Sequence, residues 1–334
     1  RLWLDKNENG DPVLAEIVRS VLATVLPETG ASYPDSTALY DKLAKHTKLP
    51  AENLILSAGS DGIIRSVFEA FIEPGDVVIH TQPTFAMYAV YAQMYGAAAK
   101  PLSYRPSNRG PVLTVENIIE TIKSSAPKLV CLPNPDSPTG TFFAANDMRN
   151  IIEAAGYVGA VMLVDEAYYP FHAETVISWV TDYPHLVVTR STGKAWGMAG
   201  YRIGYGAASS EMTVILHKVR PMYETNTVAV AVFEGMLDHV DEMLASVARL
   251  EEGKASFLTA MENLGFTTLR GSGNFLHVNF GSKAADIHQG LADLVYYRKD
   301  FKESCLRGFS RFSAATPEQF APLIAEIQAI SKKG

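Results

Sequence analysis

The stretch "VTRSTGKAWGMAGYRIGYGAAS" (188–209) holds one lysine, two arginines and no acidic residue among many small residues. It starts as an apolar run, passes through a glycine-rich segment and ends in a second strand-like run, "YRIGYGAA" (201–208). Lys194 lies in the middle segment, where small residues let a large group approach the backbone. A desolvated amine close to Arg202 has a lowered pKa, which a lysine that forms a Schiff base requires. The stretch therefore predicts a reactive lysine just beyond the end of a strand.

Other short apolar runs precede this stretch and alternate with helix-like segments, which is typical of βαβ units and a mostly parallel sheet. They are "DVVIH" (76–80), "KLVCLP" (128–133), "VMLVDE" (161–166) and "LVVTR" (186–190). Ligands of open α/β sheets bind beyond the carboxyl ends of the strands. The first candidates for function are therefore the residues that close these runs, namely Gln82, Asn134, Asp165 and Arg190.

The pattern changes near Asn226 to long amphipathic helices (228–265), followed by the strand-like "NFLHVNF" (274–280) and a helix from Pro317. A chain of 334 residues also exceeds the size of about 250–300 residues at which a single core stops growing. We predict a large α/β domain over 27–225, with helices on both faces of a mostly parallel sheet. A smaller α+β domain is expected from 1–26 together with 226–334.

Composition excludes several classes of function. A net charge of −7 without any block of like charges argues against a nucleic-acid or membrane-surface binder. Two cysteines far apart, Cys131 and Cys305, predict neither a disulfide nor a thiolate metal site, and they favour a reducing compartment. The histidines are scattered without metal-ligand spacing, and no apolar run approaches the roughly 18 residues of a membrane span. We expect a cytoplasmic protein without a metal.

Two further segments carry candidate chemistry. Asp165 ends an apolar strand, so its carboxylate needs a cationic or hydrogen-donating partner such as a ring nitrogen; an N-cap for the next helix is the alternative. In "ILSAGSDGIIRSVFEAF" (55–71), small residues come just before a helical pattern, so the helix N-terminus is suited to a phosphate. Ordinary N-capping explains that loop equally well. Together with Phe85 and Lys194, these features match what pyridoxal phosphate requires.

At this point the chain resembles the fold-type-I pyridoxal-phosphate aminotransferases, and within them the histidinol-phosphate aminotransferase branch. The similarity runs from "LDKNE" (4–8) to "RFSAATPEQ" (311–319), nearly the whole chain. The motifs between them, in the order of the family, are "YPD" (33–35), "AGSDG" (58–62), "PTFAMY" (83–88), "NPDSPTG" (134–140), "DEAYYPF" (165–171) and "GKAWGMAGYRIGY" (193–205).

The resemblance implies roles for the candidate residues. Lys194 would carry the Schiff base, Asp165 would pair with the pyridine nitrogen and Tyr168 would bond the phenolic oxygen of the cofactor. Two arginines in the second domain, Arg298 and Arg311, would bind the anionic groups of the substrate. The remaining cofactor contacts would come from Gly59, Ser60, Asp61, Ser191 and Arg202 at the phosphate, from Phe85 stacked on the ring, and from Tyr33, which would reach the cofactor of the second subunit of a homodimer.

This sequence departs from the family in several places. Ser137 stands where an asparagine usually donates to the phenolic oxygen, so that bond is lost, bridged by water or supplied by Asn134. Gly193 replaces a common serine, and Phe85 replaces a tyrosine. Near the N-terminus, Asn9 and Gly10 occupy the place of an aromatic residue that contacts substrate. These changes leave cofactor binding intact but leave the identity of the substrate open.

The expected function is therefore a homodimeric aminotransferase that exchanges an amino group between glutamate and a phosphorylated or anionic amine such as histidinol phosphate. Aromatic amino acids remain alternative substrates, and decarboxylation or elimination on a phosphorylated amino acid remains an alternative reaction on the same scaffold. A dehydrogenase would need a GxGxxG loop, which "AGSDG" does not supply. A non-catalytic module is disfavoured because Lys194, Asp165 and Arg202 are all present.

Overall fold

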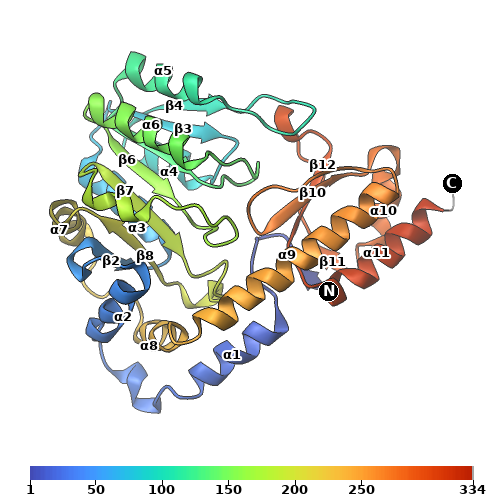
Figure 1. Ribbon diagram of the computed structural model, residues 1–334, viewed down its shortest axis with the longest axis horizontal. Helices are drawn as coiled ribbons and strands as arrows, with labels where there is room; N and C mark the ends of the chain where they lie inside the picture. The colour runs from blue at the N-terminus through green and yellow to red at the C-terminus, as the bar shows by residue number, and fades with distance from the viewer. Residues whose placement is uncertain (333–334) are drawn as a thin grey trace.

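The central sheet has seven strands in the order β2-β8-β7-β6-β5-β3-β4 (Figure 1). The computed structural model describes residues 1–332. β8 runs antiparallel to both of its neighbours, and the remaining pairs are parallel. The prediction of a mostly parallel sheet is therefore confirmed. The strands are β2 (Leu54–Ser57), β3 (Val77–Gln82), β4 (Ala98–Ser103), β5 (Leu129–Pro133), β6 (Val161–Asp165), β7 (Leu186–Ser191) and β8 (Gly204–Ala208).

Helices cover both faces of this sheet, as expected, because the inner strands are apolar on both sides. Every residue of β5 and β6 is buried. On one face, Leu129 packs with Ile63 and Phe68, whereas Val130 packs on the other face with Ile151. The first face carries α3 (Ser60–Phe71), α4 (Met87–Met94) and α7 (Ser210–Val219); the second carries α1 (Pro12–Leu22), α2 (Thr37–Thr47), α5 (Val115–Ser125), α6 (Ala145–Tyr157) and α8 (Thr227–Met236).

A smaller lobe lies beside the carboxyl ends of the parallel strands (Figure 1). It has an antiparallel sheet in the order β12-β10-β9 and a short parallel pair of β1 with β11. A core of its own includes Phe257, Leu276 and Phe312. Its elements are β1 (Leu2–Trp3), β9 (Thr267–Leu269), β10 (Phe275–Asn279), α10 (Ala284–Gly290), β11 (Val295–Tyr296), β12 (Phe309–Ser313) and α11 (Pro317–Ser331).

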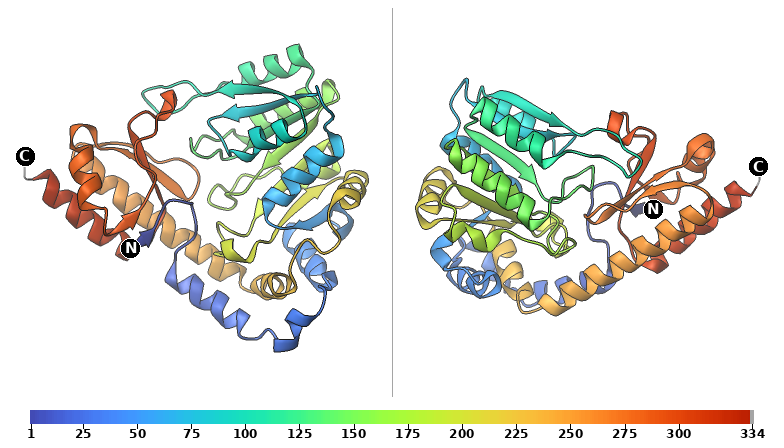
Figure 2. Two further views of the ribbon diagram at one scale, coloured as in Figure 1. Left: turned by 180° about the vertical axis from the view of Figure 1, so that it is seen from behind. Right: turned by 45° about the horizontal axis from the view of Figure 1, so that its top comes forward.

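The long helix α9 (Val240–Asn263) runs from one lobe to the other (Figure 2). Its first half contributes Met243 and Val247 to the core of the large lobe, and its second half contributes Phe257 and Met261 to the small core. Helices α1 and α8 also bury their apolar faces in the large core. The structure thus attaches β1 to the small lobe and α1 and α8 to the large one, whereas the proposed boundaries group all three elements together.

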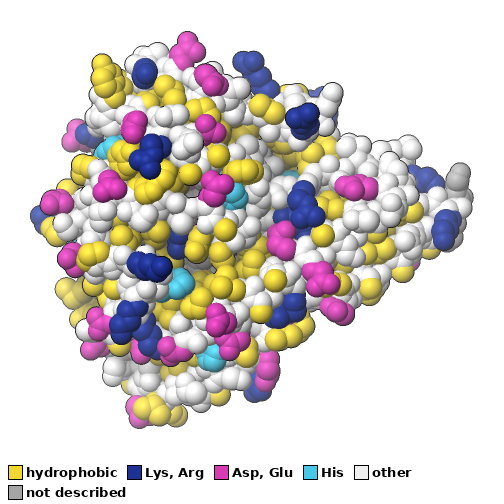
Figure 3. Space-filling model, viewed as in Figure 1, with side chains coloured by type: hydrophobic (Ala, Val, Ile, Leu, Met, Phe, Trp, Pro, Cys, Tyr) yellow, Lys and Arg dark blue, Asp and Glu magenta, His cyan; other side chains and the backbone are white. Residues whose placement is uncertain are grey.

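The surface and side-chain clusters of residues 1–332 show three further features. No helix in this range combines the length and apolar character needed to cross a membrane. Its His, Cys, Asp and Glu side chains form no group of three that could hold a metal ion. Acidic and basic side chains are interspersed over the face shown in Figure 3.

Candidate active site

A cavity of about 310 Å³ opens at the carboxyl ends of β5, β6 and β7, between the two lobes. This is the edge of an α/β sheet at which ligands bind. Lys6 and Asn7 of the N-terminal segment close one side of it. Most of the predicted site residues line this cavity: Gly59, Ser60, Asp61, Phe85, Ser137, Asp165, Tyr168, Ser191, Lys194, Arg202 and Arg311.

Lys194 lies in the loop that follows β7, and its amine faces the cavity. Its Nζ donates a hydrogen bond to the backbone oxygen of Lys6 at 2.8 Å and lies 6.0 Å from the centre of the Tyr168 ring. Burial, together with the positive charge of Arg311, lowers the pKa of the Lys194 amine to about 8. A substantial fraction of the amine is therefore neutral near physiological pH and can act as a nucleophile or a base.

Asp165 is the last residue of β6 and is almost completely buried. Its Oδ2 accepts a hydrogen bond from the Tyr88 hydroxyl at 2.8 Å, and its Oδ1 accepts one from the backbone N–H of Ala167 at 2.9 Å. Burial raises the pKa of Asp165 to about 6, although these hydrogen bonds oppose the rise. Such a carboxylate becomes easier to ionise when a cation lies against it, as expected for the partner of a protonated ring nitrogen.

The Tyr168 hydroxyl accepts a hydrogen bond from Nδ2 of Asn7 at 2.8 Å. Asn7 is buried and adopts a left-handed backbone with φ of 58°. Its own backbone is held from the small lobe, because Asn274 donates to its carbonyl and Ser313 accepts from its N–H. The N-terminal segment thus joins Tyr168 of the large lobe to β12 of the small lobe and to the residue just before β10.

The N-terminus of α3 forms a cradle suited to a phosphate. Gly59 has φ of 82°, and a Cβ placed there would lie 3.0 Å from Nη2 of Arg202, so a glycine is required at this point. The Arg202 guanidinium reaches the oxygen of Ala58 at 3.5 Å. Asp61 lies in the first helical turn, where burial raises the pKa of its carboxyl, and Tyr91 donates to its Oδ2 at 3.0 Å.

Ser137 and Arg311 meet across the two lobes. Nη1 of Arg311 donates to the Ser137 hydroxyl at 3.2 Å, and Nη2 donates to the backbone oxygen of Asp5 at 2.8 Å. The Arg311 side chain is buried, which lowers the pKa of its guanidinium. Arg298 lies directly across from Arg311, and the two residues exchange backbone hydrogen bonds of 3.0 and 2.8 Å.

Three of the residues to which the resemblance assigns a role do not line this cavity, and neither does the strand-end candidate Gln82, which is exposed. Asn134 is turned away from it, because its side chain both donates to and accepts from the backbone of Phe143. Tyr33 stacks on Tyr223 with ring centres 3.9 Å apart, and its side chain is 74% exposed. Arg298 is exposed at the rim of the small lobe, near its backbone partner Arg311.

Sequence reasoning assigned no role to Asn7 or Tyr88, although both touch predicted catalytic residues. Asn7 is 161 positions from Tyr168, and Tyr88 is 77 positions from Asp165. Both lie in quoted motifs, "LDKNE" and "PTFAMY". Tyr88 lies in the first turn of α4, and Phe85 lies in the loop before that helix. The presence of Tyr88 in the same motif as the predicted ring-stacking residue is the signal that could have identified it.

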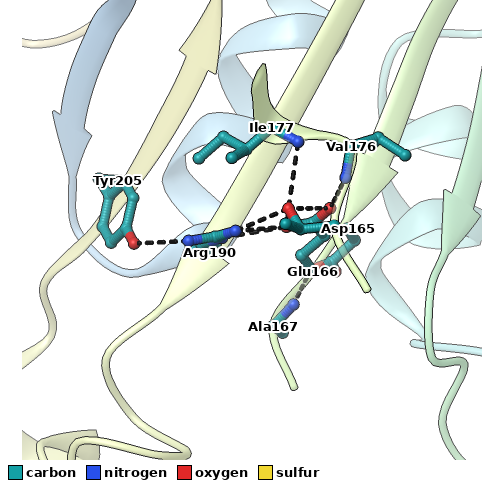
Figure 4. A network of polar contacts seen from close by, with 8 residues as sticks. Asp165, Glu166, Ala167, Val176, Ile177, Arg190 and Tyr205 are labelled. Atoms are coloured by element: carbon teal, nitrogen blue, oxygen red, sulfur yellow. Dashed lines mark hydrogen bonds and ion pairs between the residues drawn. The ribbon is translucent and has the colours of Figure 1, made fainter. Parts of the chain in front are cut away.

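Beneath the site, a buried ion pair joins β6 to β7 (Figure 4). Nη2 of Arg190 lies 2.9 Å from Oε2 of Glu166, and both side chains are almost fully buried. Glu166 also accepts from Thr175 and from the backbone N–H of Val176, and Arg190 donates to the Tyr205 hydroxyl. This network holds in place the backbone next to Asp165 and Ser191. Arg190 therefore stabilises the site from outside the cavity.

Comparison with known proteins shows the family. The model of aminotransferase classes I and II matches residues 2–327. The histidinol-phosphate aminotransferase of Thermoanaerobacter sp. (strain X514) is 32% identical over 324 residues, covering 95% of this chain and 90% of the relative. That of Symbiobacterium thermophilum is 32% identical over 340 residues, covering 99% and 91%.

Solved structures agree with the fold. The histidinol-phosphate aminotransferase of Clostridium acetobutylicum superimposes with a TM-score of 0.84 at 18% identity and covers both chains completely. The Sinorhizobium meliloti enzyme, solved in complex with pyridoxal-5'-phosphate, gives 0.83 at 20% identity and covers 99% of this chain and 91% of its own. With a lysine, a strand-end aspartate and a phosphate cradle in one cavity, the chain belongs to the class I and II aminotransferases and is an enzyme of that family.

Proposed function

We propose that this aminotransferase acts on histidinol phosphate, with glutamate and 2-oxoglutarate as the second pair of substrates. The observation that carries the proposal is a pair of arginines in the small lobe, Arg311 on β12 and Arg298 in an isolated antiparallel bridge beside it. Directly opposite residues of an antiparallel pair have their side chains on the same face. Burial and the positive charge of Arg298 both lower the pKa of the Arg311 guanidinium, so the two charged groups are near each other. Such groups bind phosphate and carboxylate in a bidentate manner. The names of the curated relatives support the same substrate.

Pyridoxal 5'-phosphate is the cofactor that fits the cavity. Within residues 1–332, Nε of Arg311 is buried without a hydrogen-bond partner, so a charged donor is available to an anionic ligand in the cavity. The backbone of Gly59 leaves open the space that a side chain would fill. When bound, the cofactor supplies an electron-accepting ring that stabilises negative charge at the substrate Cα.

Residues of this chain would bind the cofactor phosphate, orient its ring and transfer the substrate proton. Ser60, Ser191 and Arg202 would hold the phosphate, and Asp165 would keep the ring nitrogen protonated through its carboxylate. The Tyr168 hydroxyl, oriented by Asn7, would bond the phenolic oxygen. Lys194 would attach the cofactor covalently and then take the proton from the substrate Cα at its Nζ, a role suited to a pKa of about 8.

Ser137 stands where the family has an asparagine, and its contacts support a different role there, in binding Arg311. Its hydroxyl accepts from Arg311 and lies 3.5 Å from Nδ2 of Asn7. Asn134 does not substitute for the missing amide, because its side chain bonds the backbone of Phe143. Asn7, which already donates to Tyr168, is therefore the amide that we assign to this part of the cavity.

A homodimer is part of the proposal. Tyr33 is exposed beside Tyr223 and Met222, which are 50% and 77% exposed. Exposed apolar side chains gathered in this way are typical of association surfaces. Tyr33 would thus complete the cofactor site of the second subunit. Both cysteines are free and buried, which fits a reducing compartment, and we place the enzyme in the cytoplasm.

Arg298→Ala tests the substrate. A buried charge pair loses about 2–5 kcal/mol when one partner is removed, but Arg298 is exposed. We therefore expect a smaller effect, with KM for histidinol phosphate raised about tenfold, or about 1.4 kcal/mol. KM for unphosphorylated histidinol should stay the same. Arg307→Ala, another exposed arginine of this lobe, is the control. Equal losses for both substrates would contradict the assignment.

A further inference from the structure

The most completely buried carboxylate near the cavity is not part of it. Asp136 follows β5 in the motif "NPDSPTG" and has no exposed surface. Its Oδ1 accepts from the Thr84 hydroxyl at 2.7 Å, and its Oδ2 accepts from Thr81 at 2.5 Å and from Tyr104 at 2.9 Å. Burying a carboxylate is costly unless several donors surround it, so these three hydroxyls account for its presence.

The three donors come from different parts of the sheet edge. Thr81 lies near the end of β3, Thr84 in the loop that follows it, and Tyr104 just beyond β4. Asp136 therefore connects the carboxyl ends of three neighbouring strands, because β5, β3 and β4 are adjacent in the sheet. Its own loop is closed by two backbone bonds, from Asp136 to Thr141 and from Gly140 to Asp136.

Two neighbours of this cluster line the cavity. Ser137 follows Asp136 in the chain, and Phe85 follows Thr84. Phe85 is 41% exposed and meets Tyr88 edge to face, with ring centres 5.8 Å apart. Tyr88 donates to Asp165. The segment that carries Phe85 is therefore held on either side, at Thr84 by Asp136 and at Tyr88 by Asp165.

We infer that Asp136 is a positioning residue that sets the Phe85 ring and the Ser137 hydroxyl against the bound cofactor. It touches neither substrate nor cofactor, and it acts through the hydroxyl of Thr84 and through the backbone that it shares with Ser137. Without the bond to Thr84, the segment keeps the anchor at Tyr88 alone, and the Phe85 ring gains freedom to rotate away from the cavity. The inference rests on the cofactor assignment above and does not depend on which amine is the substrate.

Two nearly isosteric variants of the full chain separate positioning from stability. Thr84→Val and Thr81→Val each remove one hydroxyl from the same carboxylate, but only Thr84 adjoins a residue that lines the cavity. We expect Thr84→Val to raise the Kd for pyridoxal phosphate about tenfold, which corresponds to about 1.4 kcal/mol. It should also weaken the visible circular dichroism of the holoenzyme, which reports how the ring is seated. Thr81→Val should change the Kd less than about twofold, because its strand stays in the sheet.

Thr84→Ser, which keeps the hydroxyl, should restore the wild-type Kd and spectrum. If Thr84→Val does not fold, Asp136→Asn takes its place and should give the same loss of circular dichroism in the holoenzyme. The inference is overturned if Thr84→Val and Thr81→Val change the Kd equally, or if Thr84→Val alters thermal stability alone. Because these readouts use the cofactor only, a failure here is distinct from a failure of the histidinol phosphate assignment.

Discussion

At the scale of single residues, the chemistry depends on two groups whose pKa values are shifted toward neutrality. Burial lowers the pKa of Lys194 to about 8 and raises that of Asp165 to about 6. Between these values the aspartate is ionised, and the fraction of neutral lysine rises with pH. Desolvation thus favours the neutral form of both groups, and the hydrogen bonds from Tyr88 and Ala167 help to keep Asp165 ionised.

Tyr88→Phe should change the pH dependence of cofactor binding. The Tyr88 hydroxyl stabilises the ionised form of Asp165, so its removal raises the pKa of that carboxyl further. Because the ionised carboxylate binds the protonated ring, cofactor affinity falls as pH drops through this pKa. The midpoint should therefore move to higher pH, by roughly one unit for a bond to a charged group of about 1.5 kcal/mol.

The measurement is best made in a Lys194→Ala background, because the lysine titrates in the same range. The cofactor phosphate also titrates near pH 6, but it does so equally with both proteins. Pyridoxal phosphate affinity would be measured from pH 5 to 8 with and without the Tyr88 change. Coincident midpoints would show that Tyr88 does not act through Asp165.

Among the elements, the N-terminus of α3 and the turn before it form the phosphate site that we propose. Gly59→Ala places a side chain at a φ of 82° and 3.0 Å from Nη2 of Arg202. We expect a loss of about 1–3 kcal/mol in the free energy of unfolding from the strained backbone. Cofactor affinity should fall about tenfold or more, because the guanidinium is displaced from the cradle.

Gly75→Ala is the matched control for that change. Gly75 has φ of 94°, and a Cβ there would meet no atom within 4 Å. It should therefore lose stability in urea unfolding to a similar extent but keep the cofactor affinity of the wild type. If both variants lose affinity equally, the effect of Gly59 is one of general stability, and the cradle is not the phosphate site.

Most elements of the large lobe could be predicted from the sequence, because their strands are buried on both faces and read as apolar runs. β4 was not predicted. It lies at the edge of the sheet, most of its residues are exposed, and Lys100 and Pro101 interrupt its apolar character, as is usual for edge strands. β8 begins later than expected, since Ala199–Tyr201 forms a short 3-10 helix and Arg202 adopts a left-handed conformation.

Site residues could be predicted from the sequence where the residues next to them in the chain already indicate their function. Lys194, Asp165 and the Gly59 turn each stand out beside a strand or helix end. Asn7 could not be assigned a role in this way, because its contacts with Tyr168, Asn274 and Ser313 are between segments more than 100 positions apart. The role of Asp136 could not be predicted either, because its hydrogen-bond donors come from other segments that only the folded sheet brings together.

At the scale of the whole molecule, the cavity lies between the two lobes, and α9 connects them (Figure 2). Arg311 of the small lobe bonds Ser137 of the large one. This hydrogen bond joins the proposed substrate-binding arginine to the side of the cavity that the large lobe provides. Tyr33 does not line the cavity of its own chain, so the role that we propose for it depends on a partner subunit.

Hybrid dimers test that requirement. A Lys194→Ala chain keeps Tyr33, and a Tyr33→Phe chain keeps Lys194. If Tyr33 serves the opposite subunit, each hybrid contains one intact site. After mixing and reassociation, activity at limiting cofactor should therefore exceed that of either parent. Activity no higher than the average of the parents would place Tyr33 in the service of its own chain.

In the function that we propose, Lys194 holds pyridoxal phosphate and releases it, in its aminated form, when histidinol phosphate donates its amino group. The most direct measurement is peptide mass spectrometry after borohydride reduction, with and without prior incubation with histidinol phosphate. We expect the cofactor mass on the Lys194 peptide of the untreated enzyme and its loss after incubation with histidinol phosphate. Label on another lysine, or label on Lys194 that histidinol phosphate leaves unchanged, would contradict it.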